Sequence, residues 1–311
     1  MKTMKNFLLV LSTGYIFVYF SEHLFWARVR PDDSLLSWLG TWAAYSLLAY
    51  VFLGLVTFFR VKNIWPLFLV GAAFGWLAEG VVVQTTYEML PLSISFTGLA
   101  WHALLTVWVG WYAVRKALLF SSTWSLIKLA GAIGVAYGLW AIFWWGEADG
   151  GVASIPEFAS FTFLTSLLVI LAYWLAVWSS SEPFVLNRRT LLGVATLFVL
   201  YLVFIVIPAA PLAALILPVL LGLVYWGLRR NRLDEVEGSL MEDLRGQASP
   251  WKYISLLTLP LTASGVYSLA TTLHLQWHTG WVLYAITTPL GFFLFGVSLH
   301  KVLRMKKISS G

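Results

Sequence analysis

The sequence predicts an all-α, polytopic integral membrane protein with about ten transmembrane helices. Of its 311 residues, 60% are hydrophobic and only 11% are charged, whereas a soluble domain carries roughly 25% charged residues. The hydrophobic residues fall into ten stretches, most of them near the length of about 20 residues that a helix needs to cross a bilayer. Lysines and arginines gather at alternate ends of these stretches.

The ten expected spans form one transmembrane domain, residues 1–311. They run Phe7–Ala27, Leu35–Phe59, Ile64–Thr85, Ile94–Val114, Trp124–Trp145, Phe158–Trp178, Thr190–Ile207, Leu212–Leu228, Tyr253–Leu273 and Gly280–Val302. Pro208 and Pro211 separate the seventh span from the eighth, because proline cannot donate the helical hydrogen bond. Residues 229–252 are the only long polar connection, and their mixed charges predict a solvated amphipathic helix in the cytoplasm, with a regulatory or partner-binding role as the alternative.

The positive charges predict the orientation of the chain. If the N-terminus is inside, all 20 lysines and arginines except Arg28, Arg30 and Lys128 lie in inner segments. Lys128 begins about 6 Å inside the fifth span, close enough to extend its ammonium group to the interface. Because cytoplasmic loops are rich in Lys and Arg, we expect a multi-pass protein of the cell membrane with both termini in the cytoplasm. The net charge of +6 then reflects orientation in the lipid bilayer, and we expect no nucleic-acid partner.

Most acids and histidines lie at the opposite, outer ends of the spans. They are Glu22, His23, Asp32, Asp33, Glu79, Glu88, His102, Glu147, Asp149, Glu157, His274 and His278. Glu22, Glu79 and His102 are expected about 8, 9 and 12 Å below the outer face, from the helical rise. Ionisable groups inside a membrane are costly, so such a cluster indicates a functional site. Asp32 and Asp33 are expected to cap the second span.

Small residues place two of these groups on helix faces that can pack closely. The spacing of four residues recurs in Gly71, Gly75 and Glu79, in Gly98, His102, Thr106 and Gly110, and nearly so in Gly131, Gly134 and Gly138. Stripes of small residues let neighbouring membrane helices approach each other. We therefore expect Glu79 and His102 to point toward protein rather than lipid and to meet at one depth.

His274 and His278 close the ninth span with the spacing of two metal ligands on one helical face. His102 would supply a third nitrogen for zinc or another divalent metal, which would generate a hydroxide near neutral pH. Both histidines are equally consistent with ordinary interfacial residues. There is no cysteine, which excludes thiolate ligands and cysteine nucleophiles.

The candidate catalytic residues are Glu79, His102, Glu22 and Glu147. Glu79 would act as the general base, assisted by Glu22 or Glu147. Two alternatives stay open for Glu79 and His102: a buried pair that fixes helix packing, or a proton relay or substrate counter-charge. Glu147 is also consistent with a solvated outer loop.

Two short patterns resemble known families. The run from Ser95 to His102 resembles the histidine motif of CAAX-type intramembrane proteases, but the paired glutamates of that family are replaced by Ala78 and Glu79. The HxxxH pair in a late span resembles the alkaline ceramidase superfamily, whose serine four residues before the first histidine is Gly98 here. Because each pattern covers a short segment and lacks key residues, neither implies an activity for this chain.

Three functions remain. The first is a membrane-embedded hydrolase or transferase, acting on a lipid or other small molecule delivered by the membrane. The second is a proton-coupled secondary transporter, since ten spans with both ends inside resemble the drug/metabolite transporter class. However, the two halves show no internal repeat, and the candidate groups lie nearer the outer face than the midplane. The third is a structural or assembly subunit.

Overall fold

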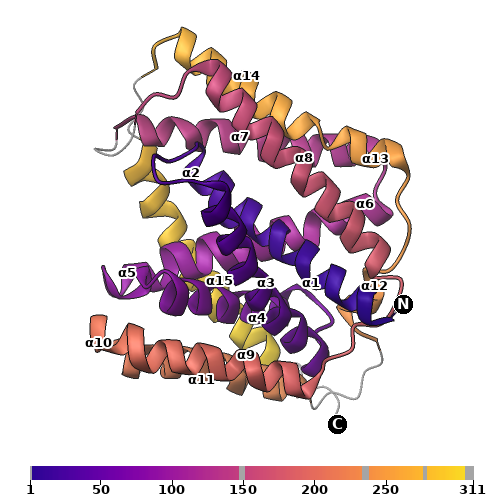
Figure 1. Ribbon diagram of the computed structural model, residues 1–311, viewed down its shortest axis with the longest axis vertical. Coiled ribbons are helices and arrows are strands. Elements are labelled where there is room, and N and C mark those ends of the chain that lie inside the picture. Colours follow the sequence, from indigo (N-terminus) through magenta and orange to yellow (C-terminus); the bar gives the residue numbers. More distant parts are fainter. Residues whose placement is uncertain (1, 147–150, 233–237, 276–278, 305–311) are drawn as a thin grey trace.

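A computed structural model describes residues 2–146, 151–232, 238–275 and 279–304 (Figure 1). Within these ranges the chain forms helices and turns without a strand, and ten helices are long and apolar enough to cross a membrane. The predicted all-α fold and the predicted number of helices long and apolar enough to span a membrane are therefore confirmed for the described residues. The elements are α1 (Lys2–Val18), η1 (Tyr19–His23), α2 (Leu24–Trp26), α3 (Leu35–Phe58), α4 (Ile64–Leu77), η2 (Ala78–Val82), η3 (Thr85–Tyr87), α5 (Leu92–Ser95), η4 (Phe96–Val114), α6 (Arg115–Phe120), α7 (Thr123–Phe143), η5 (Trp144–Gly146), α8 (Ile155–Ser179), α9 (Arg188–Tyr201), η6 (Leu202–Val206), α10 (Ile207–Ala209), α11 (Ala213–Arg232), α12 (Leu240–Asp243), α13 (Pro250–Ser255), α14 (Thr258–Thr272) and α15 (Thr279–Arg304).

The helices form a bundle with two central spans and a peripheral row. The span Ile64–Val82 is 83% buried and Thr3–Trp26 is 67% buried, whereas Arg188–Ala209 is only 11% buried. Around the central pair lie α3, η4, α7 and α8, and α14 packs across α7 and α8. The helices α9, α11 and α15 lie along the opposite side of the bundle (Figure 1). Their exposed apolar surface is what a lipid-facing helix requires.

Close glycine contacts hold α4 against η4, as the small-residue stripes predict. A Cβ atom on Gly75 would lie 2.2 Å from the carbonyl oxygen of Gly98, and one on Gly98 would lie 2.6 Å from the Trp76 ring. The stripe in α7 packs on α14 in the same way, since a Cβ on Gly134 would lie 2.3 Å from the Leu259 carbonyl oxygen. None of these three glycine positions leaves room for a larger side chain.

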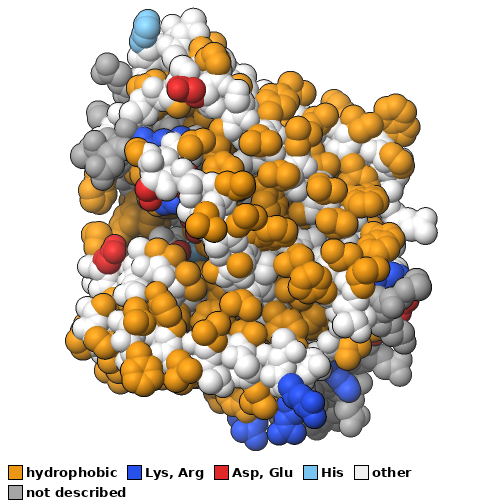
Figure 2. Space-filling model, viewed as in Figure 1, with side chains coloured by type: hydrophobic (Ala, Val, Ile, Leu, Met, Phe, Trp, Pro, Cys, Tyr) orange, Lys and Arg blue, Asp and Glu red, His pale blue; other side chains and the backbone are white. Residues whose placement is uncertain are grey.

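The predicted inner segments meet at one end of the bundle. Hydrogen bonds join Lys5 to Ser181, Tyr50 to Asn187, Asn231 to Phe59 and Lys252 to Leu118. Figure 2 shows most Lys and Arg side chains of the visible face gathered at its lower right edge, while hydrophobic side chains cover most of the rest. The connecting segments that we predict to be inner therefore lie at the same end of the bundle.

The cap of α3 is not the one we expected. The Ser34 side chain accepts a hydrogen bond from the Ser37 amide, and Ser37 bonds back to Ser34. Asp33 instead binds Arg30 at 3.0 Å. Serine reaches the first-turn amides from the N-cap position itself, which leaves the aspartate free to neutralise an arginine.

Candidate functional site

A cavity of about 370 Å³ opens at the end of the bundle that the charges predict to be the outer one, and this end is called the outer end below. Its lining comes from η1 and α2, from η2 and η3, from α5 and η4, and from η5 and α15. Figure 2 shows the hollow at the left of the molecule, with acidic and histidine side chains visible in its depth. Glu22, Glu79 and His102, three of the predicted site residues, line this cavity together.

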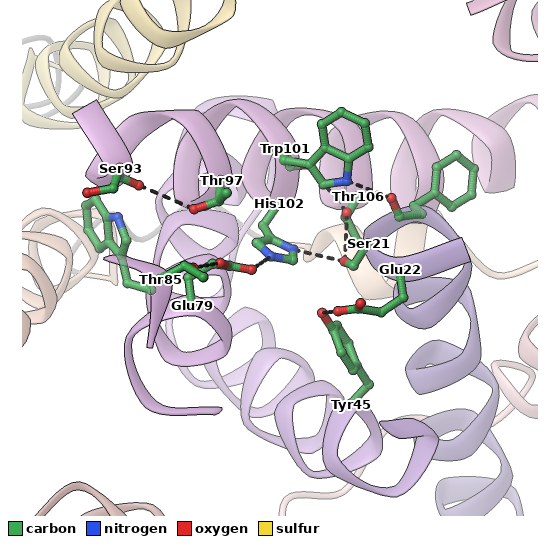
Figure 3. A network of polar contacts seen from close by, with 12 residues as sticks. Ser21, Glu22, Tyr45, Glu79, Thr85, Ser93, Thr97, Trp101, His102 and Thr106 are labelled. Atoms are coloured by element: carbon green, nitrogen blue, oxygen red, sulfur yellow. Dashed lines mark hydrogen bonds and ion pairs between the residues drawn. The ribbon is translucent and has the colours of Figure 1, made fainter. Parts of the chain in front are cut away.

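A continuous chain of hydrogen bonds crosses the inner wall of the cavity (Figure 3). One carboxylate oxygen of Glu79 lies 2.6 Å from Nε2 of His102. The other imidazole nitrogen, Nδ1, lies 2.9 Å from the hydroxyl oxygen of Ser21, which is 3.0 Å from Oγ1 of Thr106. Thr85 donates to the second carboxylate oxygen of Glu79. The predicted meeting of Glu79 and His102 is therefore confirmed, and Ser21 joins them.

The three central members of this hydrogen-bonded series all lie in π-helical turns. Ser21 lies in η1, Glu79 in η2 and His102 in η4. Such turns are rare and occur frequently at functional sites. Ser21 and Glu22, adjacent in η1, both line the cavity.

These three side chains are buried, and the His102 ring is held by packing as well as by hydrogen bonds. Ser21 is 4% exposed, Glu79 7% and His102 2%. The His102 ring packs at 5.3 Å from Phe74, edge to face. Burial removes competing water, which strengthens the hydrogen bonds and fixes the ring between its two partners.

Glu22 occupies a separate position on the cavity wall. Its carboxylate accepts hydrogen bonds from Tyr45 Oη at 2.5 Å and from Trp26 Nε1 at 3.2 Å. It makes no hydrogen bond to Glu79 or His102 among those of the described residues. Glu22 therefore lines the cavity but is not part of the hydrogen-bonded series that joins Ser21, His102 and Glu79.

The loop that closes the outer edge is tied back to η2. Tyr87 donates from its hydroxyl to the Gly80 carbonyl oxygen at 2.8 Å. Burial raises the pKa of Tyr87 to about 12, so the phenol keeps its proton and remains a donor. This bond keeps Thr85, two residues earlier, beside Glu79.

The predicted metal ligands are not gathered at this cavity. His274 follows α14 in an exposed turn and is absent from the cavity lining. Among the described residues, no group of three or more histidine or acidic side chains is placed to hold a metal ion. Both nitrogens of His102 are already engaged by Ser21 and Glu79. His278 and Glu147 lie outside the described residues, so the three-histidine zinc site remains an untested prediction.

Ser21, Thr85 and Tyr45 are the members of the site that sequence reasoning missed. Thr85 was placed at the very end of a span and Tyr45 within an apolar helix, where neither has a distinctive spacing. The signal for Ser21 was present, since a small hydroxyl stands next to Glu22 at the depth of the other candidates. The contact of Ser21 with His102 depends on how η1 packs against η4, which no spacing in the sequence reveals.

Comparison with known proteins adds no identity: no family model, curated protein or solved structure matches the chain. The function must therefore be argued from the cavity and its side chains.

Proposed function

We propose that the protein is a membrane-embedded hydrolase or transferase whose nucleophile is Ser21, with His102 as general base and Glu79 as the residue that orients and stabilises the imidazole. The observation that carries this proposal is the hydrogen-bonded series Ser21, His102 and Glu79 on the wall of a cavity. A nucleophile within reach of a base, and a base oriented by a third group, is the recurring arrangement of covalent catalysis.

The protons in this series follow from the chemistry of its members. An ionised carboxylate only accepts, so Nε2 of His102 donates to Glu79 and Nδ1 is left with its lone pair toward Ser21. The Ser21 hydroxyl then donates to Nδ1. As Oγ attacks a carbonyl carbon of an ester or amide, its proton passes to Nδ1, and Glu79 stabilises the imidazolium that forms.

The second half of the reaction returns the enzyme to its starting state. The imidazolium protonates the leaving group, and an acyl group remains on Ser21. Water, or the hydroxyl of an acceptor, then attacks this acyl group and gives its proton to His102. The bond between Oγ and the acyl carbon breaks, the acid or the acylated acceptor leaves, and His102 returns the proton to Ser21 Oγ. Water as acceptor makes the protein a hydrolase, whereas a second lipid or small molecule makes it a transferase.

A fluorophosphonate probe tests the nucleophile without knowledge of the substrate. The purified protein should gain one covalent adduct, which peptide mass spectrometry should place on Ser21. Ser21→Ala should abolish labelling, whereas Thr106→Val, which alters the neighbouring hydroxyl, should leave it within a few-fold. Unlabelled wild-type protein, or an adduct that persists in Ser21→Ala, would refute this assignment.

Proton-coupled transport is the second candidate, supported by two carboxylates, the buried Glu79 and the partly buried Glu22, in one cavity. The hydrogen-bonded groups from Thr85 to Thr106 would then carry a proton inward. In proteoliposomes, substrate uptake should follow a pH gradient, and Glu79→Gln should uncouple the two. Fluorophosphonate labelling of Ser21 is not expected of a transporter.

Insertion in the cell membrane with both ends in the cytoplasm is part of the proposal. It is supported by the separation of Lys and Arg from the acidic end. The chain has no cysteine, so single cysteines can be introduced directly. In intact cells, an impermeant maleimide should label Asp32→Cys in the outer loop and should label Gln247→Cys in the inner loop only after lysis. The reverse pattern would contradict the orientation.

A further inference from the structure

The lining of the cavity is acidic, and His102, hydrogen-bonded to Glu79, is the one basic side chain among its described residues. Three glutamates, Glu22, Glu79 and Glu88, contribute to it, and none of its described lining residues is a lysine or arginine. Glu88 is exposed at the edge, whereas Glu22 and Glu79 lie in the wall. A ligand that carries negative charge would be repelled from such a site, and a cation would be attracted.

Glu22 has hydrogen-bond donors but no counter-ion. Tyr45 and Trp26, its two partners, are both neutral. None of the ion pairs between described residues involves Glu22, while Glu79 has His102. Glu22 is partly buried; shielding a carboxylate from water without an opposite charge is costly, and two donors fix its position without supplying that charge. A bound cation would complete it.

Aromatic rings form much of the remaining wall. They are Phe25, Trp26, Phe96, Trp101, Trp144 and Tyr284. Trp26 stacks on Trp144 with ring centroids 4.9 Å apart, and the ring of Phe96 in η4 lies 4.7 Å from that of Tyr284 in α15, centroid to centroid. The buried Tyr284 hydroxyl has no hydrogen-bond partner among the described residues. Aromatic faces attract ammonium groups without requiring hydrogen bonds, and quaternary ammonium ions are recognised in this way.

We propose that the cavity binds an organic cation, either a protonated amine or a quaternary ammonium group, with Glu22 as its counter-charge and Tyr284 as an aromatic wall. This builds on the proposed function because it names the substrate class of the same site. An inorganic cation would interact mainly with the carboxylates, whereas an amine with an attached apolar chain would contact both the carboxylates and the aromatic rings of the lining. Ser21 would then lie beside the reacting bond of that substrate.

Equilibrium binding of radiolabelled choline to the purified protein in phosphatidylglycerol nanodiscs tests the proposal. Unlabelled choline should displace the label at least tenfold better than 3,3-dimethylbutan-1-ol, which has the same shape without the charge. Glu22→Gln should weaken choline binding at least tenfold. Tyr284→Leu should weaken it several-fold, while Tyr284→Phe, which keeps the ring, should not. Size-exclusion profiles establish that each variant is folded.

The outcomes separate this proposal from the proposed function. Ser21→Ala should still bind choline although it no longer reacts with the fluorophosphonate. Absent choline binding, equal displacement by the neutral alcohol, or full affinity in folded Glu22→Gln would overturn the cation site, even if Ser21 labels normally. Repetition in phosphatidylcholine nanodiscs identifies the source of the ammonium group: weaker choline binding there indicates a lipid headgroup, and unchanged binding indicates a free amine.

Discussion

His102 and Arg115 lie on one continuous helix, η4 followed by α6, and both are buried, yet their surroundings differ completely. His102 has polar partners at both ring nitrogens and faces a cavity. Arg115, about 20 Å further along at the helical rise, donates to Ser180 at 2.8 Å and packs its guanidinium 4.9 Å from the Trp111 ring centre. Its Nε and Nη1 atoms have no partner among the described residues.

The comparison shows that a buried ionisable group is not by itself a functional site. At the outer end, three π-helical turns, a carboxylate, a hydroxyl and an open volume converge on one imidazole. At the inner end, the guanidinium of Arg115 packs on one aromatic ring, that of Trp111, and donates to one serine, Ser180. Replacing the outer group should therefore affect chemistry, and replacing the inner group should affect only stability.

The largest expected effect is that of His102→Ala on the reaction of Ser21. Without its base, the rate of fluorophosphonate labelling should fall by about 10² to 10⁴-fold, while the protein remains monodisperse in detergent. Glu79→Gln should cause a smaller loss, because the base remains but is no longer oriented by a carboxylate. Time courses of adduct formation by intact mass measure both. Equal labelling in His102→Ala and wild type would reduce the outer end to a packing arrangement like the inner one.

The next effect concerns the glycine contact that brings α4 and η4 together. In Gly75→Ala the added methyl would lie 2.2 Å from the Gly98 carbonyl oxygen and 2.9 Å from Cβ of His102. Such overpacking costs about 1–3 kcal/mol, and it should also displace the imidazole from Ser21. We expect a lower Tm together with slower labelling.

Gly296→Ala in α15 is the matched control, because nothing lies within 4 Å of its added Cβ. Replacing an unconstrained helical glycine by alanine stabilises by about 1 kcal/mol at most, so Tm should stay constant or rise slightly. If both variants behave alike in thermal unfolding, the close approach of α4 and η4 is not what positions the site.

The fold was largely predictable from the sequence, but the site was predictable only in part. Length, hydropathy and the placement of Lys and Arg gave the ten helices, because lipid imposes the same requirement on every span. The glycine stripes correctly brought Glu79 to His102. Ser21 was missed because no repeated spacing links it to His102, and their contact depends on how η1 packs against η4. His274 was associated with His102 by ligand spacing alone, and spacing within one helix gives no distance to another.

The smallest expected effect is that of Arg115→Met at the inner end. Methionine keeps much of the apolar stem and removes a charge that has no acidic partner among the ion pairs of the described residues. The Ser180 hydroxyl is not orphaned, because it also donates to the Ala176 carbonyl oxygen at 2.6 Å. Replacing buried charges by apolar side chains is often neutral or stabilising by about 1–4 kcal/mol.

We therefore expect an unchanged or higher Tm for Arg115→Met. The labelling rate should stay within about twofold of wild type, because distant sites that share no partner act independently. Arg115→Lys, which keeps the charge but loses the planar donors, should be less stable than Arg115→Met. Scanning fluorimetry and the fluorophosphonate time course measure the two properties on the same samples. A marked drop in Tm for methionine alone would mean that the guanidinium is neutralised by a bound anion, and the inner end would then be a site as well.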